Sequence, residues 1–257
     1  IVRKAGPHRA KARLCKARLK ALWSLIFGGV IVPEAPVIEQ WIQPSRLFCK
    51  GRLHVGVILG VLNGKIQIIT DDIQIKEYNQ VYDFNGIICP GLIDLQVNGG
   101  GGVLFNESTN KEAIWKIAKA HRMYGTTGIL PTIITDSLSV LSHAVDAAIE
   151  AVGQHGVLGM HIEGPHISLE KCGAHEAEFV RPLDEETIRL VKKLRAANVP
   201  TMLTLAPDVV SPEDISRLVE LGAVVSIGHS KASAGVVRRA LEAGASCFTH
   251  LFNAMPP

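Results

Sequence analysis

Three short polar motifs follow apolar runs in this 257-residue sequence: HIEGPH at 161–166, GHS at 228–230 and THLFNAM at 249–255. They supply Glu163, His229 and His250 at or just beyond the ends of predicted strands. One carboxylate and two imidazoles, with a fourth position left for water, are typical of a catalytic zinc site, although histidines in loops also serve as simple hydrogen-bonding residues. We expect one divalent metal ion here, zinc by preference. It would lower the pKa of its bound water toward about 7 and polarise a substrate carbonyl.

Other residues near these motifs carry a weaker signal. In an extended segment His161 shares a face with Glu163, and we expect it to support the site or to be buried and hydrogen-bonded. Cys172 and His175 could form a nucleophile pair, but no third residue orients them. The four glycines at 99–102 lack the Lys-Ser/Thr of a phosphate-binding loop, so we expect a flexible loop there that lets the backbone approach a ligand.

The elements that position these motifs alternate between strand and helix from Gly91 onward. We expect strands at 92–97, 128–134, 156–162, 200–205, 223–227 and 246–250. Helices are expected between them at 111–124, 137–152, 184–197, 212–221 and 232–243. The polar motifs end several successive strands, which would converge on one mouth in a barrel, whereas a doubly wound sheet concentrates its chemistry at one switch point. The predicted fold is an α/β, TIM-type barrel over 91–257, incomplete at about six of eight strands.

The remaining sequence divides into two parts. Residues 46–90 are rich in branched apolar residues, with an Asn63–Gly64 turn signal, and predict the N-terminal part of a small antiparallel β domain. Residues 1–45 form a basic and apolar extension that could be disordered or a targeting segment, and its apolar run at 21–32 is too short to span a membrane.

Charge and cysteine content narrow the functional classes. Residues 1–20 carry eight basic side chains, so a chain of net charge +3 has a body of −5, which argues against a nucleic-acid binder. Five widely spaced cysteines without a CxxC pair favour a reducing, cytoplasmic location. Because the sequence opens on Ile1 and stops at Pro257, before two barrel strands, we expect it to be incomplete.

An ordered set of motifs resembles the N-acetylglucosamine-6-phosphate deacetylases of the amidohydrolase superfamily. The likeness runs from about Ile88 to Pro257 and is weaker from about Gly51. The motifs are CPGLIDLQVNGGGG, TTGILPTIIT, GVLGMHIEGPHIS, KCGAH, LTLAP, VVSIGHS and FTHLFNAMPP.

The resemblance implies an enzyme that removes acetate from a small sugar phosphate, N-acetylglucosamine 6-phosphate, and that forms a homodimer. It implies that Glu163, His229 and His250 bind the metal and that Ala174, Asn253 and Ala254 contact the substrate. Many amidohydrolases have His-x-His where this chain has Gln96 and Asn98, so a one-metal site with two polar neighbours is implied.

The catalytic residue that the resemblance implies is an Asp after the eighth strand, beyond Pro257. We therefore predict that residues 1–257 alone are inactive and marginally stable. Two alternatives stay open: another amidohydrolase acting on an amide, and a catalytically silent fragment that binds sugar phosphate or metal. A strand-ending Asp in a longer sequence would favour the enzyme over the silent fragment.

Overall fold

The computed structural model describes residues 38–256, which form two compact units that meet in sequence at Pro90 and Gly91. Most of the expected extension at 1–45 lies outside the described residues. Its last part does not, because strand β1 (Gln40–Cys49) already begins at Gln40.

The first unit is a small mixed sheet. Its elements are β1, β2 (Arg52–His54), β3 (Ile58–Leu62), β4 (Lys65–Thr70), helix α2 (Ile75–Tyr78) and β5 (Val81–Ile88). The strand order is β2-β1-β3-β4, and β5 pairs with β1 in parallel. The expected antiparallel pairing is present among β1, β2, β3 and β4, and β5 adds a parallel strand because the chain crosses back through α2 before it begins. The predicted turn joins β3 to β4, with positive φ angles of 51° at Asn63 and 69° at Gly64.

The second unit contains six parallel strands whose spatial order follows the sequence, β6-β9-β10-β11-β12-β13. Their bounds are β6 (Leu92–Val97), β9 (Thr126–Ile134), β10 (Met160–Glu163), β11 (Thr201–Leu205), β12 (Val224–Ile227) and β13 (Cys247–Phe248). A doubly wound sheet would reverse its strand order at a switch point, and this sheet does not. The predicted α/β fold, a TIM-type barrel arrangement with a β-rich sheet on its N-terminal side, is confirmed.

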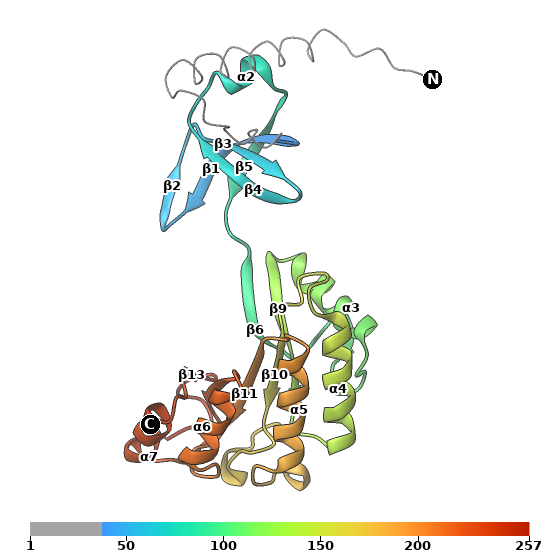
Figure 1. The fold of residues 1–257 in the computed structure, drawn as a ribbon, viewed down its shortest axis with the longest axis vertical. Coiled ribbons are helices and arrows are strands. Elements are labelled where there is room, and N and C mark those ends of the chain that lie inside the picture. Colours follow the sequence, from blue (N-terminus) through green and yellow to red (C-terminus); the bar gives the residue numbers. More distant parts are fainter. Residues whose placement is uncertain (1–37, 257) are drawn as a thin grey trace, which may run out of the picture. The chain divides into compact units, whose positions relative to one another are not determined.

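Helices connect these strands and lie beside the sheet (Figure 1). They are α3 (Lys111–Arg122), α4 (Leu138–Ala151), α5 (Glu185–Ala196), α6 (Pro212–Glu220) and α7 (Ala234–Glu242), with short 3-10 turns η1 (Leu169–Lys171) and η2 (Ala177–Phe179). The start of α6 has a clear local cause. Pro212 occupies its first turn, and the Ser211 hydroxyl accepts a hydrogen bond from the Asp214 amide at 3.1 Å.

The four-glycine segment forms a hairpin rather than the flexible loop expected from its composition. Strands β7 (Gly99–Gly100) and β8 (Val103–Leu104) pair antiparallel. The two residues between them, Gly101 and Gly102, have φ angles of 61° and 78°. A tight two-residue turn with positive φ at both positions explains why glycine stands there.

The core of the second unit, residues 91–256 and called the barrel unit from here on, lies between the sheet and the helices. Every residue of β11 is buried, and α5 contributes fully buried Leu190, Val191 and Leu194. Dense packing of this kind fixes the direction in which each strand end leaves the sheet. Among residues 38–256, no helix combines the length and the apolar character that crossing a bilayer requires.

Candidate metal centre

The ends of three strands bring one carboxylate and two imidazoles together. Glu163 is the last residue of β10, while His229 and His250 each come two residues after the end of β12 and β13. Oε1 of Glu163 lies 3.1 Å from Nε2 of His229 and 3.4 Å from Nε2 of His250. The two Nε2 atoms are 2.9 Å apart, and one ligand atom from each residue falls within 4.8 Å of the others.

The outer nitrogen of each imidazole faces a backbone carbonyl. Nδ1 of His229 donates to the carbonyl of Lys171 at 2.8 Å, and Nδ1 of His250 donates to the carbonyl of Asn253 at 3.1 Å. A neutral imidazole carries one N–H, so each Nε2 presents a lone pair to the centre of the cluster. Lone pairs on two nitrogens 2.9 Å apart repel each other unless a proton or a metal ion lies between them. This arrangement suits a metal ion.

The electrostatics of the cluster also favour positive charge. Burial would raise the pKa of Glu163. Without an ion, however, a protonated His229 donates from Nε2 to this carboxylate, and that hydrogen bond and the nearby imidazoles hold the pKa below its ordinary value. For His229 burial would lower the pKa, but the bonds to Glu163 and to the Lys171 carbonyl raise it. Glu163 is only 2% exposed, so water screens the negative charge of its carboxylate very little.

Gln96, near the end of β6, holds the second oxygen of this carboxylate. Its Nε2 donates to Oε2 of Glu163 at 2.7 Å, which leaves Oε1 facing the imidazoles. Asn98 lies just beyond β6, where its carbonyl accepts a hydrogen bond from the Phe105 amide at 2.9 Å. An amide next to a ligand carboxylate orients it without adding charge.

His161 is buried beneath the cluster and neutral. Its Nε2 meets the hydroxyl of Thr204 at 2.7 Å, and its Nδ1 lies 3.3 Å from that of Thr132. Burial lowers its pKa to about 4 although Glu163 opposes this. Both ring nitrogens are engaged, so His161 is a buried, hydrogen-bonded residue, which is one of the two roles expected for it.

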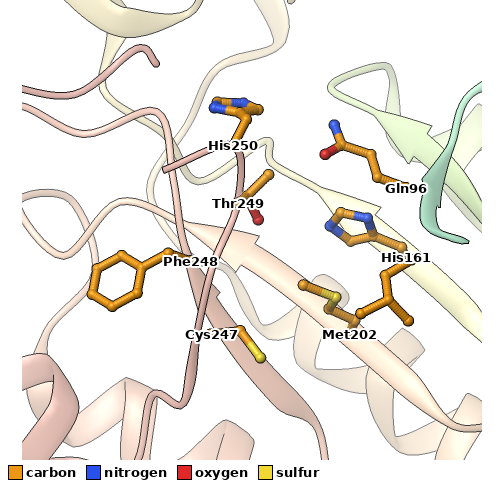
Figure 2. A pocket seen from close by; sticks show the side chains of 8 residues that line it. Gln96, His161, Met202, Cys247, Phe248, Thr249 and His250 are labelled. Atoms are coloured by element: carbon orange, nitrogen blue, oxygen red, sulfur yellow. The ribbon is translucent and has the colours of Figure 1, made fainter. Parts of the chain in front are cut away.

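A pocket of about 210 Å³ lies beside the cluster (Figure 2). Gln96 and His161 line one side of it, while Thr249 and His250 face them. Met202 and Cys247 lie at its lower part in this view, and the pocket is therefore apolar below the polar groups. Such a combination suits a small substrate with one polar reacting group.

His175 is the residue near the site that sequence reasoning placed in a different role. Its ring centroid lies 4.4 Å from that of His229, and its Nδ1 meets the Thr135 hydroxyl at 2.7 Å. Burial and the neighbouring His229 lower its pKa to about 4. No hydrogen bond joins its ring to the Cys172 thiol in the part of the chain that the structure describes, so the suggested nucleophile pair is not formed. The signal was present in KCGAH, but the path of the loop decides which way His175 faces.

The three residues expected to contact substrate lie in the loops around the cluster. Ala174 is exposed beside His175. Asn253 holds the His250 ring through its carbonyl, and the Ala254 carbonyl accepts a hydrogen bond from the Ser230 amide at 3.1 Å. Their contact with substrate stays a prediction.

Known proteins with similar sequences are named as deacetylases of N-acetylated amino-sugar 6-phosphates. An N-acetylgalactosamine-6-phosphate deacetylase of Shewanella sp. (strain ANA-3) is 46% identical over 173 residues, which are 66% of this chain and 43% of that protein. An N-acetylglucosamine-6-phosphate deacetylase of Haemophilus influenzae is 34% identical over 203 residues, covering 77% of this chain and 52% of that protein. The chain thus spans about half the length of the curated relatives it matches.

A solved structure supports the same relationship. The N-acetylglucosamine-6-phosphate deacetylase of Pasteurella multocida is 35% identical, and the two folds superpose with a TM-score of 0.79 over 85% of this chain and 58% of the other. The sequence model of the amidohydrolase family matches residues 87–256. The resemblance inferred from the motifs is confirmed, and the chain belongs to the amidohydrolase family.

Proposed function

We propose that this chain forms the metal-binding part of a hydrolase that removes acetate from the N-acetyl group of an amino-sugar 6-phosphate. The observation that carries the proposal is that Nε2 of His229 and Nε2 of His250, 2.9 Å apart, converge on the buried carboxylate of Glu163. The names of the relatives at 34% to 46% identity support the reaction class.

We propose zinc as the ion, held by Glu163, His229 and His250, because two imidazoles and one carboxylate suit it well. A bound ion of this kind supplies Lewis-acid polarisation of the acetamide carbonyl and a lower pKa for water. The chain's own contribution is to keep three donors converged. Gln96 orients the carboxylate, and the carbonyls of Lys171 and Asn253 keep the outer imidazole nitrogens protonated.

Proton transfer to the leaving amine needs a further group. Glu163 is the carboxylate of the cluster, and as a ligand it is committed to the ion. We assign the proton transfer to the Asp that the resemblance implies beyond Pro257. General acid–base help contributes about 10²- to 10⁴-fold, so residues 1–257 alone should bind metal and turn over substrate at least about 100-fold more slowly than the longer protein.

Two sugars compete as the substrate. N-acetylglucosamine 6-phosphate follows from the resemblance and from most of the named relatives, whereas the relative at 46% identity is named for N-acetylgalactosamine 6-phosphate. The two differ only in the configuration at C4. Both present the same acetamide to the metal centre, so the metal site cannot distinguish them. A homodimer also belongs to this proposal and rests on the resemblance alone.

The test compares Glu163→Gln with Glu178→Gln, which makes the same change at an exposed position of η2. Zinc binding is measured on this chain, and acetate release on the longer protein with each sugar, before and after a chelator. We expect Glu163→Gln and the chelator to abolish turnover, and Glu178→Gln to retain it. Full turnover by Glu163→Gln would refute the ligand assignment. Zinc binding without acetate release from either sugar would favour a silent binding protein.

A further inference from the structure

Three loops at the mouth of the barrel unit meet at the carboxylate of Asp208. This residue follows β11, and its Oδ2 accepts a hydrogen bond from the hydroxyl of Ser168, in the loop after β10. Its Oδ1 accepts one at 2.5 Å from the hydroxyl of Ser230, in the loop after β12. Both serines are only 2% exposed, whereas Asp208 itself is exposed, so it is the hydroxyl ends of these two bonds that are shielded from water.

The two serines flank the backbone of His229. Ser230 is the next residue, and the Ser168 amide donates to the His229 carbonyl at 2.9 Å. His229 has a φ of 50°, in the left-handed region that residues with a side chain rarely adopt. A conformation of this kind persists only where its surroundings hold it, and such residues cluster at functional sites.

The same contacts reach the loop that carries His250. The Ser230 amide donates to the Ala254 carbonyl at 3.1 Å, and the Ser230 hydroxyl accepts from the Ala232 amide at 3.0 Å. Because a carboxylate can only accept, this hydroxyl donates its own proton to Asp208. A carboxylate can accept from two hydroxyl groups at once, which makes an acidic side chain the fitting partner.

We propose that Asp208 is a positioning residue for the metal centre, acting through Ser168 and Ser230 to hold His229 in its ligand conformation. The inference rests on the proposed metal site. Groups that orient the ligands of a metal change its affinity by about 10- to 100-fold when they are removed.

A matched control is available in the same two loops. Lys231 forms an ion pair with Glu170, and this pair also joins the β12 loop to the β10 loop. Its two side chains are 50% and 69% exposed, whereas the two serines that meet Asp208 are buried. Exposed ion pairs contribute little, so Glu170→Ala should change the metal affinity by less than about fivefold. The Glu170→Ala variant tests whether the loss of any contact between these two loops weakens metal binding.

The experiment measures the zinc affinity of wild type, Asp208→Ala and Glu170→Ala by competition with a chromophoric chelator. It is done at a temperature at which circular dichroism shows all three metal-free proteins folded. We expect Asp208→Ala to bind zinc about 10- to 100-fold more weakly than wild type. Failure of wild type to bind zinc would refute the metal site and with it the role of Asp208, whereas equal zinc affinities of wild type and Asp208→Ala would refute that role alone.

Melting of the metal-free proteins separates positioning from general stability. Asp208→Ala and Glu170→Ala with equal zinc affinities would overturn the proposal, whatever their melting midpoints. A lower midpoint for Asp208→Ala with zinc affinity equal to that of wild type would also overturn it. Should Asp208→Ala not fold, Ser168→Ala removes one arm of the same arrangement, and an unchanged zinc affinity there would equally refute the role.

Discussion

The β-rich unit and the barrel unit bury their apolar side chains very differently. Among the described residues of the first unit, the buried apolar side chains are Pro44, Leu47, Ile58 and Leu59, and β4 has no buried residue. In the second unit, β11 is buried along its whole length and α5 adds a buried face. Glu163 and His229 follow β10 and β12, in which most residues are buried, whereas His250 follows β13, in which Phe248 is exposed. Dense packing therefore fixes the ends of β10 and β12, and these ends place Glu163 and His229.

The sharpest test of this contrast is a cavity in the barrel core. Leu194 of α5 is fully buried, so Leu194→Ala should lower the free energy of unfolding by about 2–5 kcal/mol. Urea denaturation followed by circular dichroism measures the change. Leu241→Ala in α7, where the side chain is 40% exposed, makes the same substitution and should cost much less. Similar losses for both variants would contradict the assignment of the core.

The strand ends could be predicted from the sequence because they depend on local information. Apolar runs that stop at a polar motif mark the point where a strand leaves the core, and Glu163 falls at the end of β10 as expected. The expected first residue of β10 is less accurate. The segment expected from 156 enters the sheet at Met160, because Val157 makes only an isolated bridge with Ile129.

Features that depend on the path of a long connection could not be predicted. His175 approaches His229 because the loop after β10 folds back over the strand ends, and no spacing in the sequence encodes that direction. The parallel pairing of β5 with β1 has the same origin, since the crossover through α2 sets it. The bonds of Asp208 to two serines likewise appear only when three loops meet.

A smaller effect should appear when the pH is lowered. His166 is buried, and this burial lowers the pKa of its ring. The positive charge of Arg181 lowers the pKa further, whereas the Arg181 carbonyl and Asp184 favour the charged ring but do not outweigh burial. The unfolded chain then binds more protons than the folded chain in mild acid. The contribution of this residue to stability is complete above the ordinary histidine pKa of about 6.5 and is lost as the pH falls below it.

The variant His166→Asn checks this pH dependence. An Asn side chain can still donate to the carbonyls that Nδ1 of His166 meets at 3.1 Å and 3.0 Å, but it does not titrate. We expect its free energy of unfolding to fall less than that of wild type between pH 7 and pH 5. His143→Asn, at an exposed position of α4, should follow wild type. Parallel curves for wild type and His166→Asn would assign the acid sensitivity to other groups.

The smallest expected effect concerns the exposed face of the β-rich unit. Ile66 of β4 is 53% exposed, and Ile66→Thr keeps the branched β-carbon that strands favour. We expect its free energy of unfolding to stay within about 0.5 kcal/mol of wild type in urea denaturation. Ile58→Thr in the neighbouring strand β3 makes the same change at a position 1% exposed, and the buried hydroxyl should cost about 1–3 kcal/mol. If both variants lost as much, β4 would have a covered face, and the contrast between a thin and a dense core would fail.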